Sequence, residues 1–248
     1  MSRERGAAKT ALDFKLRRTK RGELVLESGD FDHSVLPPPG KLTGGVWDAL
    51  ASTPLLLPAR ALPLRILLLG VGGGSVLHLW DRVLESWTWT GIERDARARK
   101  LFREAFGLPR APGELVAGDA LDYVRATKRR WDLVVDDLFD ESFRPTLDQP
   151  GWLLRLRRCV ARGGALVTNL VWDDGRTSAN RAYRDRLLAA FPHHVQITCD
   201  DSENRVLVSS ETALLSRGVG ARFAQRTGVA EAWKGFRARA LRGKVSAT

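Results

Sequence analysis

The sequence predicts an α/β fold built on a doubly wound, mostly parallel, seven-stranded sheet. One sign is the continuous apolar run of residues 66–69, which ends in glycines and is typical of a strand buried on both faces. Another is the alternation of such runs with amphipathic helical segments, which indicates βαβ units. Because crossovers between parallel strands are right-handed, we expect helices on both faces of the sheet. Sheets of this kind bind ligands beyond the carboxyl ends of their strands.

The individual elements follow one another regularly. Strands are expected at residues 66–69, 87–92, 115–117, 131–135, 165–171, 195–198 and 206–209, the last two as a hairpin. Apolar residues recur at helical spacing from Ala98 to Phe106, and Gly107 ends that helix. Further helices are expected after the glycines near residue 74, after Asp148, and from Thr177 to Phe191. We divide the chain into a basic flexible arm (1–22), a small N-terminal β segment or lid (23–60), a ligand-binding catalytic domain (61–210) and a basic, helical C-terminal extension (211–248).

Composition excludes several classes of protein. The chain has 248 residues, of which 44% are hydrophobic and 28% charged, so wholesale disorder is excluded. No apolar run approaches the length of a membrane span, and no secretory signal follows the first residues. The two cysteines, Cys159 and Cys199, form no CxxC pair, which excludes a zinc ribbon or a disulfide scaffold. We therefore expect a cytoplasmic globular protein without a metal site.

The net charge of +11 is concentrated at the two ends of the chain. Residues 1–22 carry a net charge of +6 and residues 217–248 carry +7, whereas the remainder carries −2. Basic termini can bind nucleic acid or another anionic surface through phosphate contacts. They can equally be solvated ends of an arginine-rich chain, so both interpretations stay open.

Three polar features follow three successive predicted strands. The glycine loop at residues 70–75 follows the first strand and opens a helix, where free N–H groups favour an anionic or polar ligand. Glu93 ends the second strand at the offset where an acid binds ribose hydroxyls. Asp119 follows the third strand and could accept from an adenine amine, while Ala120 donates its N–H to the ring. The alternatives are a tight turn, a surface acid paired with a neighbouring arginine, and a helix N-cap.

In this order the segments resemble class I S-adenosylmethionine-dependent methyltransferases, which are Rossmann-like. They resemble more closely the spermidine-synthase-like branch of that fold. The similar stretches are ILLLGVGGG at 66–74, GIERD at 91–95, GDA at 118–120 and DLVVD at 132–136. The resemblance covers about residues 23–210, and the β segment at 23–35 is similar to the small N-terminal β-domain of that branch.

The resemblance implies S-adenosylmethionine, or its decarboxylated form, as the cofactor. The glycines would cradle the amino-acid part and the ribose, and the acids would hold the ribose, the adenine and the ammonium group or the acceptor. The cofactor-binding residues expected from it are Gly70, Gly72, Gly74, Glu93, Asp119, Ala120 and Asp136.

Departures from the polyamine synthases concern the amine pocket. Those enzymes carry an Asp in the glycine loop where this chain has Gly73, and Tyr-His-Glu where it has Trp47-Asp48-Ala49. After the fourth strand they carry Asp-Ser-Ser-Asp-Pro, whereas residues 136–140 read Asp-Asp-Leu-Phe-Asp, with the second acid displaced. An amine pocket needs carboxylates to pair with ammonium groups. We therefore expect the fold and cofactor site to carry over, and methyl transfer rather than aminopropyl transfer.

Acidic residues after the fourth strand are the candidates for acceptor chemistry. Asp136 and Asp137 are the expected catalytic residues, and Asp136 is favoured as base because it directly ends an apolar strand. Asp140, Trp172 and His33 are expected to line the substrate pocket, the last from the lid. A solvated acidic loop and a packed loop aromatic are the structural alternatives.

Three functional hypotheses follow. The first is methyl transfer from S-adenosylmethionine to a small molecule or peptide. The second is aminopropyl transfer, as in spermidine synthases. The third is a non-catalytic nucleic-acid-binding protein that uses its basic termini. A nicotinamide dehydrogenase fits least, because Ser75 replaces the last glycine of the dinucleotide pattern. The sequence leaves a homodimer open.

Overall fold

The computed structural model describes residues 13–139, 149–171, 177–200 and 202–242. A three-stranded antiparallel sheet consists of β1 (Lys15–Arg18), β2 (Leu24–Ser28) and β3 (Phe31–Leu36). The large sheet consists of β4 (Leu64–Leu69), β5 (Trp87–Glu93), β6 (Gly113–Ala117), β7 (Trp131–Asp136), β8 (Val160–Val171), β9 (His193–Cys199), β10 (Asn204–Ser210) and β11 (Phe236–Arg242). Helical segments are α1 (Val46–Ser52), η1 (Thr53–Leu56), α2 (Ser75–Val83), α3 (Ala96–Leu101), η2 (Phe102–Phe106), α4 (Ala120–Ala126), α5 (Trp152–Cys159), α6 (Thr177–Ala190) and α7 (Val219–Thr227).

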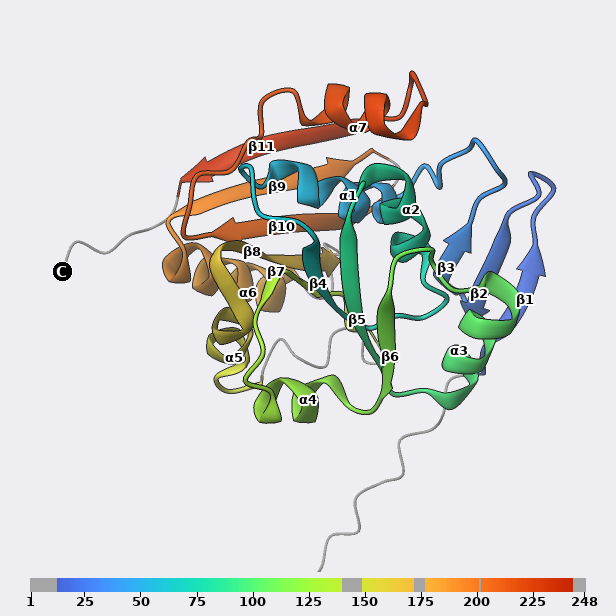
Figure 1. Ribbon diagram of the computed structural model, residues 1–248, viewed down its shortest axis with the longest axis horizontal. Helices are drawn as coiled ribbons and strands as arrows, with labels where there is room; N and C mark the ends of the chain where they lie inside the picture. The colour runs from blue at the N-terminus through green and yellow to red at the C-terminus, as the bar shows by residue number, and fades with distance from the viewer. Residues whose placement is uncertain (1–12, 140–148, 172–176, 201, 243–248) are drawn as a thin grey trace, which may run out of the picture.

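The large sheet has the strand order β11-β9-β10-β8-β7-β4-β5-β6 (Figure 1). The pairs β8–β7, β7–β4, β4–β5 and β5–β6 are parallel, whereas β10 is antiparallel to both of its neighbours. The predicted doubly wound, mostly parallel fold is confirmed, and β9 and β10 form the expected antiparallel pair. The sheet has eight strands rather than seven because β11 pairs with β9 at one edge.

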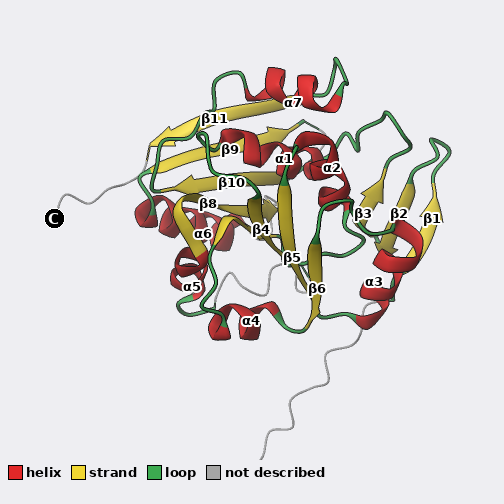
Figure 2. Cartoon of the chain, viewed as in Figure 1, coloured by secondary structure: helices red, strands yellow, loops and turns green. Residues whose placement is uncertain are grey.

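Helices cover both faces of this sheet (Figure 2). Successive residues of β4 point to opposite faces, so that Leu68 belongs to one apolar cluster and Leu67 to the other. The first cluster includes buried side chains of α1, α2 and α7, and the second those of α4, α5 and α6. Burial of β4 on both faces explains its continuous apolar run.

The structure revises three expected boundaries. Residues 15–18, which we placed in the flexible arm, form β1 and pair with β2. The segment 23–60 is not only a lid, since α1 packs on α2 and on the large sheet. The extension 211–248 contains α7 but also β11, so it is not simply helical. None of the helices in the described ranges combines the length and apolarity needed to cross a membrane.

Candidate functional site

Backbone hydrogen bonds align the predicted site residues along the carboxyl edge of the sheet. The N–H of Asp137, just after β7, donates to the carbonyl oxygen of Leu69 at 3.0 Å. The N–H of Gly118, just after β6, donates to the carbonyl oxygen of Glu93 at 3.2 Å. Gly70 follows Leu69, and Asp119 follows Gly118. Parallel strands therefore bring the glycine loop and three acidic positions to one edge, as the sequence predicts.

Glu93 binds the glycine loop directly. Its Oε2 accepts from the N–H groups of Val71 at 3.1 Å and Gly72 at 3.0 Å, while Oε1 accepts from the N–H of Asp95 at 2.9 Å. A carboxylate has about four acceptor positions. Described residues of the chain therefore fill three and leave about one for a hydroxyl group. Glu93 thus fixes the shape of the loop, a role that sequence reasoning missed.

At two positions of the glycine loop, neighbouring atoms lie too close to leave room for a side chain. Gly70 has φ +84°, and a Cβ there would collide with the carbonyl oxygen of Asp137. A Cβ on Gly73 would lie 2.8 Å from the ring of Phe106, which is 6% exposed. An aspartate at this position, as in polyamine synthases, would need that ring to move. The departure at Gly73 therefore has a local physical cause.

The small sheet contacts the glycine loop through β3. Ser34 Oγ accepts from the N–H of Gly73 at 2.7 Å, and Ser75 Oγ accepts from the N–H of Val35 at 2.6 Å. Both hydroxyls are buried. These contacts place the N-terminal sheet beside the loop. No sequence pattern around Ser34 predicted its contact with the loop.

His33 packs within the N-terminal sheet. Its ring lies edge-on to Phe14 with the ring centroids 5.0 Å apart. Burial lowers the pKa of His33, and the charge of Asp32 only partly opposes that shift. The imidazole is therefore neutral at pH 7. The backbone of His33 lies against Gly72, but its contribution to a substrate pocket stays a prediction.

Asp119 has the capping role that was the structural alternative. It is the N-cap of α4, and its Oδ1 accepts from the N–H of Leu121 at 2.7 Å. Ala120 is buried and begins the helix. Capping engages one carboxylate oxygen of Asp119, so it is compatible with a ligand contact by the other.

The two adjacent aspartates at the end of β7 have different environments. Asp136 is 0% exposed, and its Oδ2 accepts from the indole N–H of Trp152 at 3.0 Å. Its side chain therefore points into the face covered by α5. Asp137 is half-buried, and its Oδ1 accepts from the amide of Asn169 at 2.8 Å. Asp137 is thus the more accessible of the two carboxylates, and the choice of Asp136 as base stays a prediction.

Asn169 is held by a chain of polar side chains across two strands. It is 3% exposed on β8, and its Oδ1 accepts from the amide of Asn204 at 2.8 Å. Asn204 Oδ1 in turn accepts from the hydroxyl of Ser202 at 2.7 Å. This chain orients the N–H group of Asn169 toward Asp137. No sequence motif pointed to it, because the partners come from strands far apart in sequence.

Counting from Asp137 instead of Asp136 changes how the segment after β7 aligns with the Asp-Ser-Ser-Asp motif of the polyamine synthases. Counted from Asp137, the next acid is Asp140, three residues on, which is the spacing of Asp-Ser-Ser-Asp. The second acid is then not displaced, although the proline is still absent. Asp140 and Trp172 lie outside the described residues. Asp48, in contrast, accepts from the N–H groups of Thr43 and Gly44, and burial raises its pKa, so it serves α1 rather than an amine pocket.

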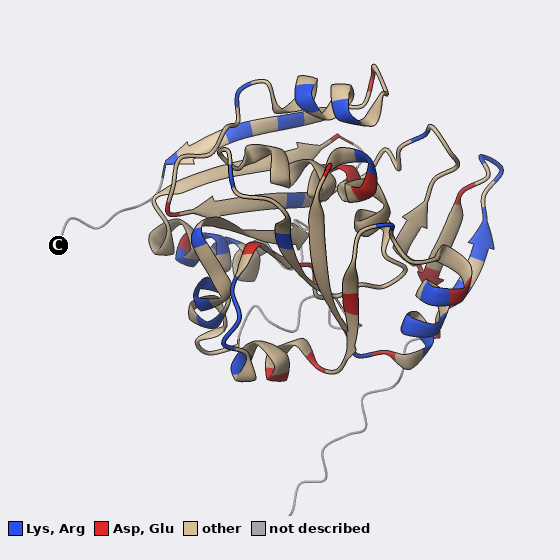
Figure 3. Ribbon diagram, in the orientation of Figure 1, with Lys and Arg blue, Asp and Glu red and all other residues tan. Residues whose placement is uncertain are grey.

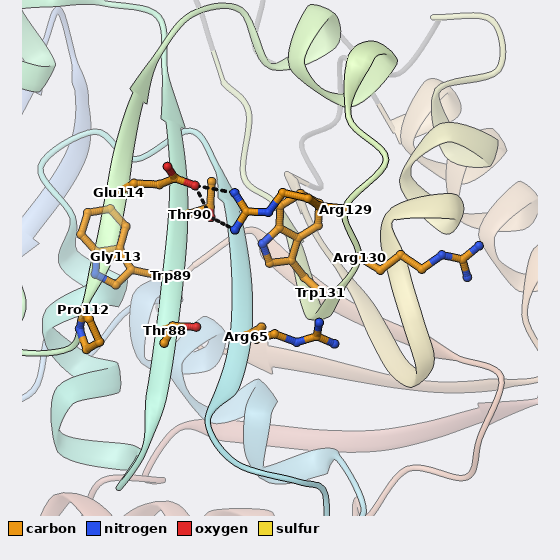
Figure 4. A pocket seen from close by; sticks show the side chains of 10 residues that line it. All are labelled: Arg65, Thr88, Trp89, Thr90, Pro112, Gly113, Glu114, Arg129, Arg130 and Trp131. Carbon is orange, nitrogen blue, oxygen red and sulfur yellow. Dashed lines mark hydrogen bonds and ion pairs between the residues drawn. The ribbon is translucent and has the colours of Figure 1, made fainter.

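The described residues hold no group of three or more His, Cys, Asp or Glu side chains that could bind a metal ion. A groove of about 450 Å³ lies at the opposite, amino-terminal edge of the sheet (Figure 4). None of the predicted site residues lines it.

Known proteins support the resemblance seen in the sequence. No model of a known protein family matches the chain. Polyamine aminopropyltransferases from two strains of Neisseria meningitidis, of serogroups A and B, are each 28% identical to it over 156 residues. The match covers 62% of this chain, and the chain spans 58% of the length of these relatives.

Solved structures share the fold. A probable spermidine synthase from Corynebacterium glutamicum has a TM-score of 0.75 at 19% identity and covers 93% of this chain and 87% of its own. A spermidine synthase in complex with the transition-state analogue AdoDATO has a TM-score of 0.58 at 16% identity, covering 80% and 73%. Human methyltransferase-like protein 13 in complex with SAH has a TM-score of 0.55 at 21% identity, covering 73% and 87%. The expected resemblance to the spermidine-synthase-like branch is confirmed.

Proposed function

We propose that this chain is a transferase that binds a sulfonium nucleoside at the carboxyl edge of its sheet. We further propose that it transfers the aminopropyl group of decarboxylated S-adenosylmethionine to an amine. The observation that carries the proposal is the half-buried carboxylate of Asp137, a residue whose backbone lies against Gly70 and whose side chain is oriented by Asn169. Similarity to polyamine aminopropyltransferases favours this reaction over the methyl transfer that we first expected from the sequence.

The residues at this edge fit a nucleoside. Glu93 retains about one acceptor position for a ribose hydroxyl, and Asp119 retains the oxygen that does not cap α4. The glycine loop beside Glu93 is held in place, because Glu93 and Ser34 bind its N–H groups. The loop therefore contributes shape, and the two carboxylates contribute hydrogen bonds.

Asp137 has the role of positioning and deprotonating the acceptor amine. The amine nitrogen forms a bond to the carbon beside the sulfonium sulfur, and the carbon–sulfur bond breaks with its electron pair on sulfur. The proton released by the amine passes to the Asp137 carboxylate and then to solvent. Since the sulfonium is already activated, alignment of the two reactants supplies much of the rate.

Methyl transfer from S-adenosylmethionine is the second candidate. It is favoured by the ring of Phe106, which fills the space of an acid at position 73, and by Asp48, whose carboxylate binds the N–H groups of Thr43 and Gly44. Both features remove carboxylates that would pair with ammonium groups.

Isothermal titration with each nucleoside, followed by product analysis by mass spectrometry with putrescine as acceptor, tests the proposal. We expect tighter binding of the decarboxylated form and an acceptor heavier by one aminopropyl group. A preference for the carboxylated nucleoside would replace aminopropyl transfer by methyl transfer. Binding of neither would reject the nucleoside site.

A further inference from the structure

The edge of the sheet opposite the proposed site is rich in exposed cations. The groove there runs over the amino-terminal ends of β4 to β7 (Figure 4). It is lined by Arg65, Thr88, Trp89, Thr90, Pro112, Gly113, Glu114, Arg129, Arg130 and Trp131. Three of these ten side chains are arginines and one is an acid. The groove is therefore positively charged and distinct from the carboxyl edge.

Some of the cations around the groove have no acid to neutralise them. Arg129 binds Glu114 at 2.6 Å, and Figure 4 shows it crossing the groove while Arg130 points away. Four exposed cations at this end of the sheet make no side-chain hydrogen bond or ion pair with another described residue. They are Lys128, Arg130, Arg158 and Arg162. Together with Arg65 and Arg129 they form what we term the amino-edge cluster.

Contacts of Asp132 and Arg60 link two members of the amino-edge cluster, Arg65 and Arg162. Asp132 binds Arg60 at 2.6 Å and Arg65 at 3.1 Å, and Arg60 also donates to the carbonyl oxygen of Arg162 at 3.0 Å. The segment just before β4 therefore lies near the starts of β7 and β8, which pair with each other.

Helix α5 connects two further members of the amino-edge cluster, Arg130 and Arg158. Burial raises the pKa of the Cys159 thiol, and the charges of Arg158 and Arg130 both oppose that rise. Arg158 lies in the last turn of α5, which packs on β7, the strand that directly follows Arg130. Figure 3 shows Lys and Arg along α5 and along the segment that joins α4 to β7.

We propose that the amino-edge cluster binds the phosphate backbone of a nucleic acid. A row of cations beside a groove suits an extended polyanion that enters the hollow, whereas a bilayer presents a flat surface. The ring of Trp131 is 2% exposed and is covered by Arg129 at 5.3 Å, so it is not available to stack on bases. Binding should therefore depend on charge and not on sequence. This inference does not rest on the proposed transferase activity, and it uses the folded domain rather than the basic termini.

Fluorescence anisotropy with a labelled 20-nucleotide poly(U) RNA, between 50 and 300 mM salt, tests the inference on the full chain. The test variant carries Lys128→Gln, Arg130→Gln and Arg158→Gln. The matched control carries Arg18→Gln, Lys20→Gln and Arg21→Gln, which are exposed cations on the N-terminal sheet and its turn without side-chain partners among the described residues. Both variants lose the same net charge, and circular dichroism verifies that both fold.

We expect the test variant to bind RNA at least tenfold more weakly at 100 mM salt. Its slope of log affinity against log salt should be smaller by about 2, because each lost contact to a single strand contributes about 0.7. The control should change affinity less than threefold. Equal losses in both variants, no RNA binding by the unaltered protein at 50 mM salt, or binding to phosphatidylserine vesicles in place of RNA would each overturn the proposal.

Discussion

Charged side chains have different partners at the two edges of the large sheet. At the carboxyl edge, the acids accept hydrogen bonds from the chain's own N–H groups, as Glu93 and Asp119 do, or from side-chain amides, as Asp137 does. At the amino edge, Glu114 and Asp132 form ion pairs with arginines, and cations remain in excess. One edge thus holds carboxylates oriented by hydrogen bonds, where we propose a sulfonium and an amine, whereas the other presents exposed cations, where we propose a polyanion. The two proposed sites lie at opposite ends of the same strands.

The largest effect is expected from replacing the proposed base at the carboxyl edge. Asp137→Asn should lower the rate of transfer by about 100-fold or more, because it removes the proton acceptor. Nucleoside affinity should stay within about threefold. Initial rates under saturating nucleoside and amine measure the change.

Asp136→Asn is the matched control for that prediction. Its amide oxygen can still accept from Trp152, so the rate of transfer should fall less than tenfold. A larger loss for Asp136→Asn than for Asp137→Asn would favour Asp136 as the base and contradict the role that we propose for Asp137.

A second substitution compares two acids at opposite edges of the sheet, Glu93 and Glu114. Glu93→Ala should weaken nucleoside binding by about 10- to 100-fold, because it removes the charge-assisted hydrogen bond to the ribose. It should also lower the free energy of unfolding by about 1–3 kcal/mol, since the N–H groups of Val71 and Gly72 lose their acceptor. Calorimetric titration and urea unfolding measure the two effects.

Glu114→Ala serves as the comparison. Glu114 binds Arg129 and Thr90 at the amino edge, and that arginine lowers its pKa. Nucleoside affinity should change less than twofold in this variant. Unchanged affinity in Glu93→Ala would reject the ribose assignment, whatever Glu114→Ala does.

A smaller effect is expected from the polar chain behind Asp137. Asn204→Ala should lower kcat about 3- to 10-fold, because it releases the Asn169 amide from its fixed orientation. The KM for the nucleoside should stay unchanged, since Glu93 and Asp119 are not contacted. A fall in thermal stability without a change in kcat would assign the chain a purely structural role.

The smallest effect concerns pH. Burial lowers the pKa of His33 below its usual value near 6.5, so the unfolded chain takes up a proton that the folded chain resists. The stability contribution is therefore complete above about pH 6.5 and is lost as pH falls through the folded-state pKa. Amide hydrogen exchange of β3 should accelerate at pH 5.5 relative to His33→Gln. Identical exchange in both proteins would contradict this.

Sequence reasoning located the carboxyl edge because strand periodicity and the polar residue after each strand are local signals. It named both Asp136 and Asp137 and favoured Asp136 as base, because the pattern of β7 does not show that Trp152, from a distant helix, covers Asp136. Asn204 and Ser34 escaped notice for the same reason, since their partners are set by tertiary packing. β11 was missed because Arg alternates with Ala along it, which is the composition of an exposed edge strand.

The most direct measurement is a calorimetric titration of the full chain with decarboxylated S-adenosylmethionine and, separately, with S-adenosylmethionine. We expect the decarboxylated nucleoside to bind more tightly. We also expect Glu93→Ala to weaken this binding at least tenfold, whereas the combined variant Lys128→Gln, Arg130→Gln and Arg158→Gln leaves it unchanged. Tighter binding of the carboxylated nucleoside, or no binding of either, would contradict the claim that the carboxyl edge is built for aminopropyl transfer.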